Sequence, residues 1–569
     1  MGMRLVRRSL LEYFAGLGLS STLLADSLCA QLNGETGSQI TPEMLRSAAG
    51  VAGLTFTDSE LGAMLTGANQ SLSTYEELRK ASFDNSLAPP LYFNPLLPGM
   101  LVDRTAKPFR PHRPSRAGRP GSAAEIAFLP VTHLAELIRT KQITSVELTE
   151  IYLDRLKRYG PTLNCVVNLT EERARRQARE ADKEISAGQY RGPLHGIPWG
   201  VKDLFATKGY PTTWGAAPFR NRIIVEDATV VSRLDEAGAV LVAKLATGEL
   251  ARDDIWFGGQ TKNPWDLSMG SQGSSAGPGA ATAAGLAGFS IGTETLGSIV
   301  EPSGICGVTG LRPSFGRVSR HGAMTVSWSL DKAGPMCRTV DDCALVLAAI
   351  QGPDNQDLSV QSVPFNWDAA LDIRKLRVGY LKSAFADTKQ TAQTDANDAQ
   401  ALDVFRKMGV SLIEVRLPEQ PRVDARAILY SEANAALKDP LRIQPEGLVR
   451  QDRVAAQNGL RLFPAADYLD CNRARTVLMR AMARIMSEVD VYLCPFDYAD
   501  YTPNPIATSN TLITNLTGQP SVVVPHGFNE KGNPTSLTFA GRVFGEAAML
   551  AAARAYQEAT DWHRKHPKM

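Results

Sequence analysis

Residues 269–302 read MGSQGSSAGPGAATAAGLAGFSIGTETLGSIVEP and form the densest cluster of glycine and serine in the chain. Glycine-rich loops often bind phosphate groups, but this stretch contains neither G-x-x-x-x-G-K-[ST] nor G-x-G-x-x-G. Its glycines therefore need another explanation. Three patterns that contain a nucleophilic serine can be compared with it and with its surroundings.

Two of the three patterns do not fit their surroundings. Residues 273–277 match G-x-S-x-G, in which the serine follows a strand, but the preceding NPWDLSMGSQ is typical of a loop. Ser329 and Lys332 match S-x-x-K, but the S-D-N and K-T-G sequences that belong to that site do not occur. Neither pattern is therefore favoured.

The third pattern is an ordered set of four motifs in the middle of the chain. They are GIPWGVKD at 196–203, QGSSAGP at 272–278, GTETLGS at 292–298 and CGVTGLRP at 306–313. This succession resembles the amidase signature family, whose hallmark is a Gly-Ser-Ser-rich segment. The similarity is strongest from about 128 to 352 and continues more loosely through NLTGQP at 515–520. An ordered set is far more specific than any one of its motifs.

The resemblance implies a catalytic Ser-cis-Ser-Lys triad. Lys202 matches the family's lysine, Ser274 the bridging serine that follows a cis peptide, and Ser298, 24 residues later, the nucleophile. A lysine is a base only when it is neutral, and apolar neighbours such as Trp199 and Leu204 would lower its pKa by burial. Ser274 would relay the proton from Ser298 to Lys202 and later donate it to the leaving amine.

The resemblance also implies an oxyanion hole of backbone N–H groups beside the nucleophile. These groups belong to Thr295, Leu296, Gly297 and Ser298, with Gly273 and Ser275 in supporting positions. The family's usual Asp-Thr-Gly-Gly-Ser-Ile-Arg is altered here, because Leu296 replaces a glycine and Val300 replaces the arginine. The substrate of a better-known family member therefore cannot be assigned to this chain. Variable segments, 250–258 and 425–505, are expected to form the pocket walls.

The composition of the 569-residue chain is that of an ordinary globular protein. It contains 61 Lys and Arg against 59 Asp and Glu, so the net charge of +2 is not typical of a nucleic-acid binder. The seven cysteines form no C-x-x-C pair, and no H-E-x-x-H occurs among the seven histidines. We therefore expect neither a disulfide scaffold, nor a metal, nor a cofactor.

The N-terminus is typical of a segment that is not part of the fold. Residues 1–30 contain Arg7-Arg8, an apolar run and a small-residue end, which predicts a signal peptide of the twin-arginine type. An amphipathic first helix is the alternative. The rest of the chain is expected to comprise a helical N-terminal appendage over 31–103, a Pro/Arg-rich linker over 104–120 and the catalytic domain over 121–569.

Helical and strand patterns alternate through the catalytic domain. Thr144 and Glu147 predict a capping box, and Asp227 predicts the N-cap of another helix. Strands are expected near 197–203, 239–245, 288–295, 376–381, 490–495 and 520–525. The sequence therefore predicts an α/β fold with a large mixed, mostly parallel central sheet that helices cover on both faces.

Together these patterns predict an exported, periplasmic or secreted serine hydrolase that cleaves linear carboxylic amides through a Ser298 acyl-enzyme. Esters and urethanes of aryl amines are its expected side substrates. Its expected partner is a small-molecule substrate, with no nucleic acid, no membrane in the mature form, and a monomeric or homodimeric state. An alternative is the A subunit of a tRNA-dependent amidotransferase, which has the same motifs but works inside the cell with partner subunits and tRNA. A binding module with a decayed site is a third reading, which the intact triad disfavours.

Overall fold

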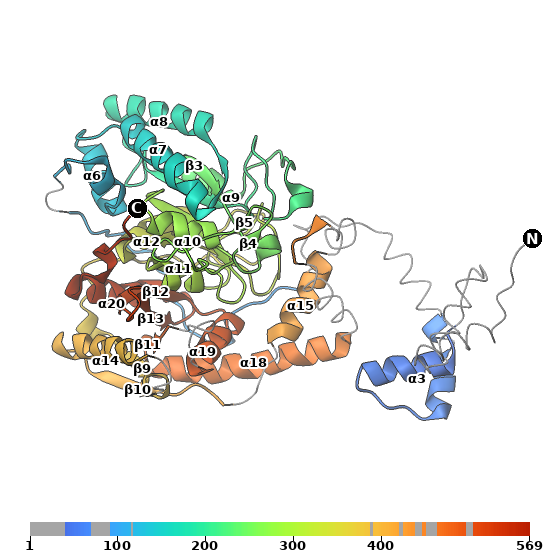
Figure 1. Ribbon diagram of the computed structural model, residues 1–569. Coiled ribbons are helices and arrows are strands. Elements are labelled where there is room, and N and C mark those ends of the chain that lie inside the picture. The colour runs from blue at the N-terminus through green and yellow to red at the C-terminus, as the bar shows by residue number, and fades with distance from the viewer. Residues whose placement is uncertain are drawn as a thin grey trace, which may run out of the picture. The chain divides into compact units, whose positions relative to one another are not determined.

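The structure is a computed structural model (Figure 1) that describes residues 40–65, 67–69, 91–114, 118–386, 391–419, 425–437, 447–450, 464–496 and 505–569. The chain divides into a smaller compact unit, residues 1–84 with 461–467, and a larger unit, residues 85–460 with 468–569. The expected signal peptide, residues 1–30, lies outside the described residues. No helix in the described ranges is long and apolar enough to cross a membrane.

The larger unit contains one sheet with the strand order β1-β3-β2-β6-β8-β7-β12-β13-β11-β9-β10. Its strands are β1 (Val166–Leu169), β2 (Pro198–Lys202), β3 (Val240–Leu245), β6 (Phe289–Glu294), β7 (Thr309–Arg312), β8 (Lys332–Cys337), β9 (Val378–Leu381), β10 (Leu412–Val415), β11 (Val491–Pro495), β12 (Ser521–Phe528) and β13 (Pro534–Gly541). A separate two-stranded ribbon consists of β4 (Ile255–Trp256) and β5 (Gly259–Gln260).

Parallel pairing joins β3, β2 and β6 in one block and β11, β9 and β10 in another. The strands between the two blocks pair antiparallel. For example, β12 and β13 follow each other through a short turn, which permits only antiparallel pairing. The mixed α/β sheet is thus confirmed, and its parallel pairs are gathered into these two blocks.

Each strand predicted from an apolar run is present, namely β2, β3, β6, β9, β11 and β12. No local pattern predicted β8, because its residues KAGPMC contain Gly334 and Pro335, which usually interrupt strands. None predicted β7 either, which is only four residues long. Both strands lie between β6 and β12 and complete the sheet across its centre.

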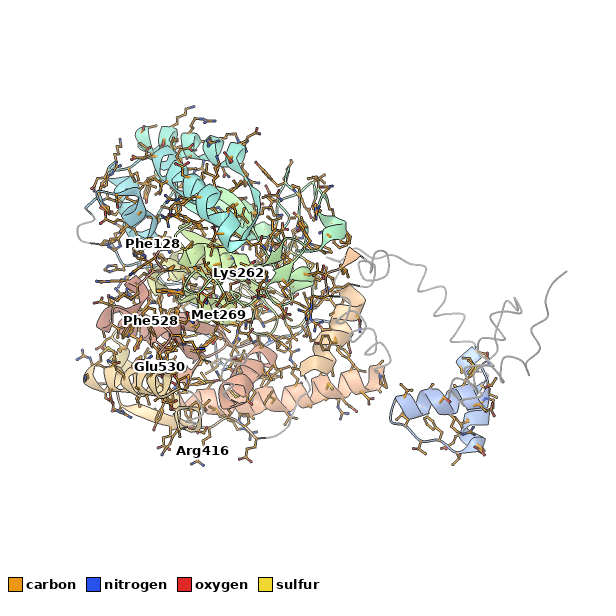
Figure 2. All side chains as sticks on the ribbon, in the orientation of Figure 1. Phe128, Lys262, Met269, Arg416, Phe528 and Glu530 are labelled. Carbon is orange, nitrogen blue, oxygen red and sulfur yellow. The ribbon has the colours of Figure 1, made fainter. Side chains whose placement is uncertain are left out.

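Helices cover both faces of the sheet (Figures 1 and 2), as predicted. On β3, the buried side chains of Val240 and Val242 pack in a core with α7, α8 and α10, whereas Leu241 packs in the main core with α6, α9, α12 and α20. Because alternate strand residues face opposite sides, the two cores lie on the two faces. The helices are α3 (Pro42–Val51), α5 (Ala123–Ala127), α6 (Val131–Arg139), α7 (Ser145–Leu163), α8 (Glu171–Ser186), α9 (Thr229–Glu236), α10 (Ala276–Ala283), α11 (Val300–Cys306), α12 (Val340–Ile350), α13 (Lys382–Phe385), α14 (Ala392–Lys407), α15 (Ala425–Ala436), α18 (Ala465–Glu488), α19 (Pro505–Leu516) and α20 (Glu546–Ala559).

Two helix starts differ from the predicted caps because ion pairs compete for the capping carboxylates. Thr144 accepts a hydrogen bond from the Glu147 N–H, but the Glu147 carboxylate binds Arg119 instead of completing the capping box. Asp227 forms an ion pair with Arg173, and α9 begins after Ala228 without a side-chain cap. In both helices, an arginine distant in sequence therefore binds the carboxylate that was expected to cap the helix.

Residues 104–110 of the expected linker lie along the segment 362–368 of the larger unit. The Arg104 guanidinium donates to the Ser362 carbonyl at 3.1 Å, and the Arg110 N–H donates to the Trp367 carbonyl at 2.9 Å. A basic segment that binds the backbone of its own domain acts as a strap across the surface.

Candidate active site

The ends of two parallel strands bring the predicted residues together. β2 ends at Lys202 and its parallel neighbour β6 ends at Glu294, so both carboxyl ends lie at the same edge of the sheet. The loop after β6 carries Ser298 and leads into α11, and the loop that carries Ser274 leads into α10. The Ser275 N–H donates to the Ser298 carbonyl at 3.2 Å, which holds the two loops against each other.

The Lys202 amine is fully buried and contacts three oxygen atoms. Its Nζ lies 2.8 Å from Ser274 Oγ, 2.9 Å from Thr293 Oγ1 and 3.3 Å from the Thr293 carbonyl oxygen. Within the described ranges it has no ion-pair partner. Burial lowers the pKa of Lys202 well below its usual range, and the more distant charges of Asp331 and Glu294 offset this only in part.

The three contacts of Lys202 suit a neutral amine. A neutral amine has two N–H groups, which match the two oxygens of Thr293, and one lone pair, which can accept the proton of the Ser274 hydroxyl. The geometry can therefore move a proton from Ser274 to Lys202.

The Gly273–Ser274 peptide bond is cis, as the resemblance implied. Gly273 has no room for a side chain, because a Cβ there would collide with the Asp253 carbonyl oxygen. The neighbouring Ser275 hydroxyl donates to the Thr293 carbonyl at 3.0 Å and accepts from the Thr293 N–H at 3.2 Å. Ser275 is thus engaged by the backbone of β6, which is a structural role and not that of a nucleophile.

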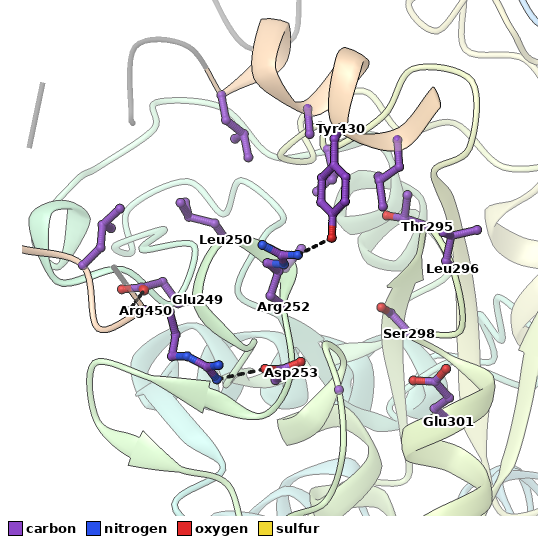
Figure 3. Close-up of a pocket in the computed structure, with 17 residues that line it drawn as sticks. Glu249, Leu250, Arg252, Asp253, Thr295, Leu296, Ser298, Glu301, Tyr430 and Arg450 are labelled. Atoms are coloured by element: carbon purple, nitrogen blue, oxygen red, sulfur yellow. Dashed lines mark hydrogen bonds and ion pairs between the residues drawn. The ribbon is translucent and has the colours of Figure 1, made fainter. Parts of the chain in front are cut away.

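Ser298 lies in a pocket of about 220 Å³ (Figure 3). Its hydroxyl has no hydrogen-bond partner among the residues that the structure describes, so the structure does not join it to Ser274. The S-x-x-K pair is not brought together, because Ser329 Oγ donates to Glu432 while Lys332 binds the Thr295 carbonyl and Asn515. Of the candidate serines, Ser298 is the one with an unengaged hydroxyl in a pocket.

The loop between β6 and α11 presents free backbone N–H groups. Those of Leu296, Gly297 and Ser298 have no acceptor in the described part of the chain, whereas those of Ile299 and Val300 donate to the Glu294 carboxylate. Gly297 has a φ of +95°, a left-handed conformation that favours glycine. Three unengaged donors beside a serine hydroxyl have the composition of an oxyanion hole.

Thr295, the fourth residue predicted for the oxyanion hole, is held by neighbouring side chains. Its hydroxyl donates to Asp331 at 2.7 Å, and its carbonyl accepts from Lys332 at 3.3 Å. These contacts fix the start of the loop. Burial is the main cause of the lowered pKa of Lys332 as well, but of these two buried lysines only Lys202 contacts a serine hydroxyl.

Sequence reasoning missed the buried Glu294 cluster under this loop. Glu294 Oε2 accepts from Ile299 N and Val300 N at 2.9 and 3.0 Å, while Oε1 accepts from Arg312 at 2.8 Å and Asn515 at 2.9 Å. Burial alone would raise the pKa of Glu294, but the charges of Arg312 and Lys332 lower it to about 2. Arg312 lies in the CGVTGLRP motif and Asn515 in NLTGQP, but neither motif indicates which residue it contacts.

The pocket walls come largely from the segments expected to form them. Residues 249–253 form one wall, and Leu429, Tyr430 and Ala433 of α15 form another together with Leu448. The described residues contain no group of three or more His, Cys, Asp or Glu side chains that could hold a metal ion.

A serine-directed fluorophosphonate is expected to label Ser298, because the reagent needs an accessible hydroxyl beside oxyanion donors. Peptide mass spectrometry of the labelled protein locates the modified residue, and a Ser298→Ala variant should remain unlabelled. A label on Ser275 would show instead that the G-x-S-x-G serine is the nucleophile.

Comparison with known proteins identifies relatives over most of the chain. The family model described as Amidase matches residues 147–550. The chain is 36% identical over 483 residues to the A subunit of the glutamyl-tRNA(Gln) amidotransferase of Roseiflexus castenholzii, and the match covers 78% of this chain and 98% of that protein. A peptide amidase structure from Stenotrophomonas maltophilia covers 75% of this chain and 96% of its own, with 31% identity and a TM-score of 0.64. A structure from a vestigial complex related to the origin of an s-triazine catabolic enzyme covers 76% and 98%, with 29% identity and a TM-score of 0.68.

These relatives overturn three of the predictions. The prediction of an exported hydrolase with a small-molecule substrate is wrong. The relatives that match over nearly their whole length bear the name of an amidotransferase component. The prediction of no nucleic-acid partner is wrong, since the name of those relatives includes a charged tRNA. Net charge averages the whole surface and therefore does not exclude such a partner. Export is wrong too, because charged tRNA is used inside the cell, and residues 1–30 lie outside the described residues.

Cleavage of amide C–N bonds is the chemistry that the family model and these relatives have in common. Because the family model matches well over half of the residues and the relatives match along nearly their whole length, this chain belongs to the amidase signature family.

Proposed function

We propose that this protein is the amide-cleaving subunit of a tRNA-dependent amidotransferase. The observation that carries the proposal is the 36% identity to the A subunit of a glutamyl-tRNA(Gln) amidotransferase over 98% of that protein's length. The arrangement of Lys202, Ser274 and Ser298 supports it, because these residues can release ammonia from an amide donor. A partner subunit would then use the ammonia on glutamyl-tRNA.

The proposed reaction starts with a linear carboxamide in the Ser298 pocket. Ser298 Oγ attacks the carbonyl carbon while its proton passes through Ser274 to the neutral Lys202 amine. The N–H groups of residues 296–298 stabilise the oxyanion. The C–N bond then breaks, the proton returns through Ser274 to the leaving nitrogen, and ammonia departs. Water finally hydrolyses the acyl-enzyme to the free acid.

The same acyl-enzyme chemistry supports the proposal that esters and urethanes are slow side substrates, since both have a carbonyl carbon that Ser298 can attack.

We also propose that residues 121–569 form the catalytic domain, within which the family match lies, and that residues 31–103 form an appendage. The proposed catalytic domain contains all the residues of the site.

The test is reconstitution with partner subunits. The chain is mixed with the remaining subunits of the Roseiflexus castenholzii amidotransferase in place of that enzyme's own A subunit, and glutaminyl-tRNA(Gln) formed from glutamyl-tRNA(Gln) is measured. We expect amide transfer that the Ser298→Ala variant lacks. Ammonia release without any transfer to tRNA, in an assembly that the native A subunit makes active, would show that the chain does not have this role.

A further inference from the structure

Residues 93–110, which we call the docked segment, precede the proposed catalytic domain in sequence but pack against it. Three apolar side chains of this segment share a cluster with three from elsewhere in the larger unit, namely Leu96, Met100 and Val102 with Val363, Val543 and Phe544. Further along, the Asn366 side chain accepts from the Lys107 N–H at 2.9 Å and donates to the Thr105 carbonyl at 2.9 Å. The docked segment is therefore held by both apolar and polar contacts.

Phe93, the first residue of the docked segment, lies in a closely fitting seat. Its ring meets the Phe315 ring in a T-shaped contact, with the two centroids 5.0 Å apart. Gly518 has a φ of +73°, and a Cβ there would lie 2.8 Å from Pro95 Cβ and 3.1 Å from Phe93 Cε1. Glycine at this position thus leaves the room that the ring of Phe93 occupies.

A buried guanidinium lies over the Phe93 ring. Arg475 of α18 is 1% exposed, and its Cζ lies 3.5 Å from the ring centroid. Within the described ranges no carboxylate lies at ion-pair distance from Arg475. Burial lowers the pKa of Arg475 to about 10, so the group is still charged at neutral pH. Because a cation is attracted to the face of an aromatic ring most strongly away from water, Phe93 helps to hold Arg475 in place.

Arg475 connects Phe93 to the pocket wall α15 through Ser329. Its guanidinium donates to the Ser329 hydroxyl at 2.9 Å and to the Ser329 carbonyl at 3.0 Å. The Ser329 hydroxyl and N–H in turn donate to the Glu432 carboxylate at 2.7 and 2.9 Å. Glu432 belongs to α15 and is followed by Ala433, which lines the pocket. Ser329 thus joins a buried cation to an anion of the pocket wall.

The helix α15 contacts both the opposite pocket wall and a residue of the proposed oxyanion hole. The Tyr430 hydroxyl accepts from Arg252 of the opposite wall at 2.6 Å (Figure 3). Ile428 packs in a buried cluster with Leu478 of α18, and Leu296 packs against that cluster. Leu296 replaces a glycine of the family pattern, and a glycine has no side chain to make this contact. A shift of α15 would therefore disturb the pocket wall and an oxyanion donor together.

We propose that Phe93 is a positioning residue for the Ser298 site, because it holds Arg475 and, through Arg475, the α15 wall of the pocket. This inference rests on the proposed function, since it concerns the reactivity of Ser298. An aromatic side chain that lies outside the proposed catalytic domain, residues 121–569, thereby shapes the pocket inside it.

The test compares the rates at which a fluorophosphonate labels Ser298 in full-length variants. Phe93→Leu keeps an apolar side chain but offers no ring face to Arg475. We expect its labelling to slow by about 10- to 100-fold, the scale of loss that a small displacement in a reactive site causes. Phe93→Tyr keeps the ring and should label within about threefold of the wild type. If Phe93→Leu labels as fast as the wild type, or Phe93→Tyr as slowly as Phe93→Leu, the ring does not position the site.

The matched control is Phe109→Leu, which removes another ring of the docked segment, one that packs on Phe365 with the centroids 6.1 Å apart. It should label at the wild-type rate. Ser329→Ala breaks the connection from Arg475 to α15 and should slow labelling by itself. Phe93→Leu should add little to Ser329→Ala, because residues that act through one another do not have additive effects. A Ser329→Ala variant as fast as the wild type, fully additive effects, or equal slowing by Phe109→Leu would overturn the proposal.

Failure of the proposed function gives a different result, because hydrogen exchange of the α15 backbone amides needs no reactive serine. If Ser298 of the wild type takes no label, the amide-cleaving role falls, and exchange measured by mass spectrometry decides the inference. Faster exchange of α15 in Phe93→Leu and Ser329→Ala, but not in Phe109→Leu, would uphold the positioning role. Equal exchange in these variants and the wild type would overturn it.

Discussion

Lys202→Met should slow acylation of Ser298 by about 100- to 10,000-fold while the fold survives, because this range is what general-base catalysis usually contributes. Methionine keeps a similar length and an apolar stem, which suits a fully buried position. It removes the only amine that contacts Ser274 in the described residues. The Thr293 carbonyl still accepts a hydrogen bond from the Ser275 hydroxyl, so the loss of the Lys202 donor should cost little stability. Single-turnover acylation by a chromogenic amide measures the effect.

The pH dependence of the wild type follows from the same burial. Desolvation disfavours the charged form, so the Lys202 amine loses its proton at a lower pH than an exposed lysine does, which is a lowered pKa. The base is the neutral form, and the acylation rate should therefore rise with pH through this lowered pKa and then level off. Lys202→Met should show no such rise. Lys202→Arg should also fail, because a guanidinium stays protonated at any usable pH.

The matched control is Lys244→Met, which removes a second fully buried lysine from the neighbouring strand β3. Lys244 is paired with Asp203 at 2.8 Å, so its removal leaves a buried carboxylate unpaired and should lower the melting temperature. In the folded protein the acylation rate should nevertheless stay close to that of the wild type. If Lys202→Met acylates within about tenfold of the wild type, Lys202 does not act as the base.

The parts of the fold that were predictable from the sequence are those with local signals. The strand β3 reads VLVAKL, a buried apolar run bounded by turn residues. The ordered motifs predicted Lys202, Ser274 and Ser298 as site residues, of which the structure brings Lys202 and Ser274 into contact. No local signal marks β8, whose Gly334 and Pro335 are held in the sheet by pairing with β6 and β7. Neighbouring strands outweighed the local preference in that case.

The unpredicted parts of the site depend on partners that are distant in sequence. Arg252 and Tyr430 are separated by 178 residues, and Glu294 and Asn515 by 221. A sequence shows that such polar residues exist, but burial and pairing arise only when strands and loops meet. The comparison with relatives changed the functional hypothesis for a related reason, because a partner subunit of the kind that the relatives' name implies would leave no local pattern in the chain.

Glu294→Gln should destabilise the protein by about 3 to 5 kcal/mol, the usual cost of leaving a buried charge without its partner. All four described contacts of the Glu294 carboxylate are with donors, two on each oxygen. A glutamine replaces one acceptor oxygen by an NH₂ group, so its N–H groups would face other donors. Arg312 loses its ion-pair partner, and Lys332 loses a nearby negative charge. Chemical unfolding measures the loss of stability.

The pH range of this contribution follows from the lowered pKa of Glu294. A carboxylate with a pKa of about 2 in the folded state and about 4.5 in the unfolded state stabilises the fold fully above pH 4.5. The contribution falls as the pH drops from about 4.5 towards 2. The difference in stability between the wild type and Glu294→Gln should therefore be constant near neutral pH and shrink in acid.

The Glu546→Gln variant is a control that distinguishes an effect on the stability of the fold from an effect on the shape of the oxyanion loop, the loop of residues 295–298. Glu546 is equally buried, pairs with Arg317 at 2.8 Å and accepts from the Ser314 N–H at 2.9 Å, but it does not line the pocket. Both variants should lose stability. Only Glu294→Gln should also slow fluorophosphonate labelling of Ser298, by at least tenfold, because Glu294 holds the N–H groups of Ile299 and Val300 directly after the oxyanion loop. Equal labelling rates in the two folded variants would mean that the Glu294 cluster supports the fold and does not shape the oxyanion hole.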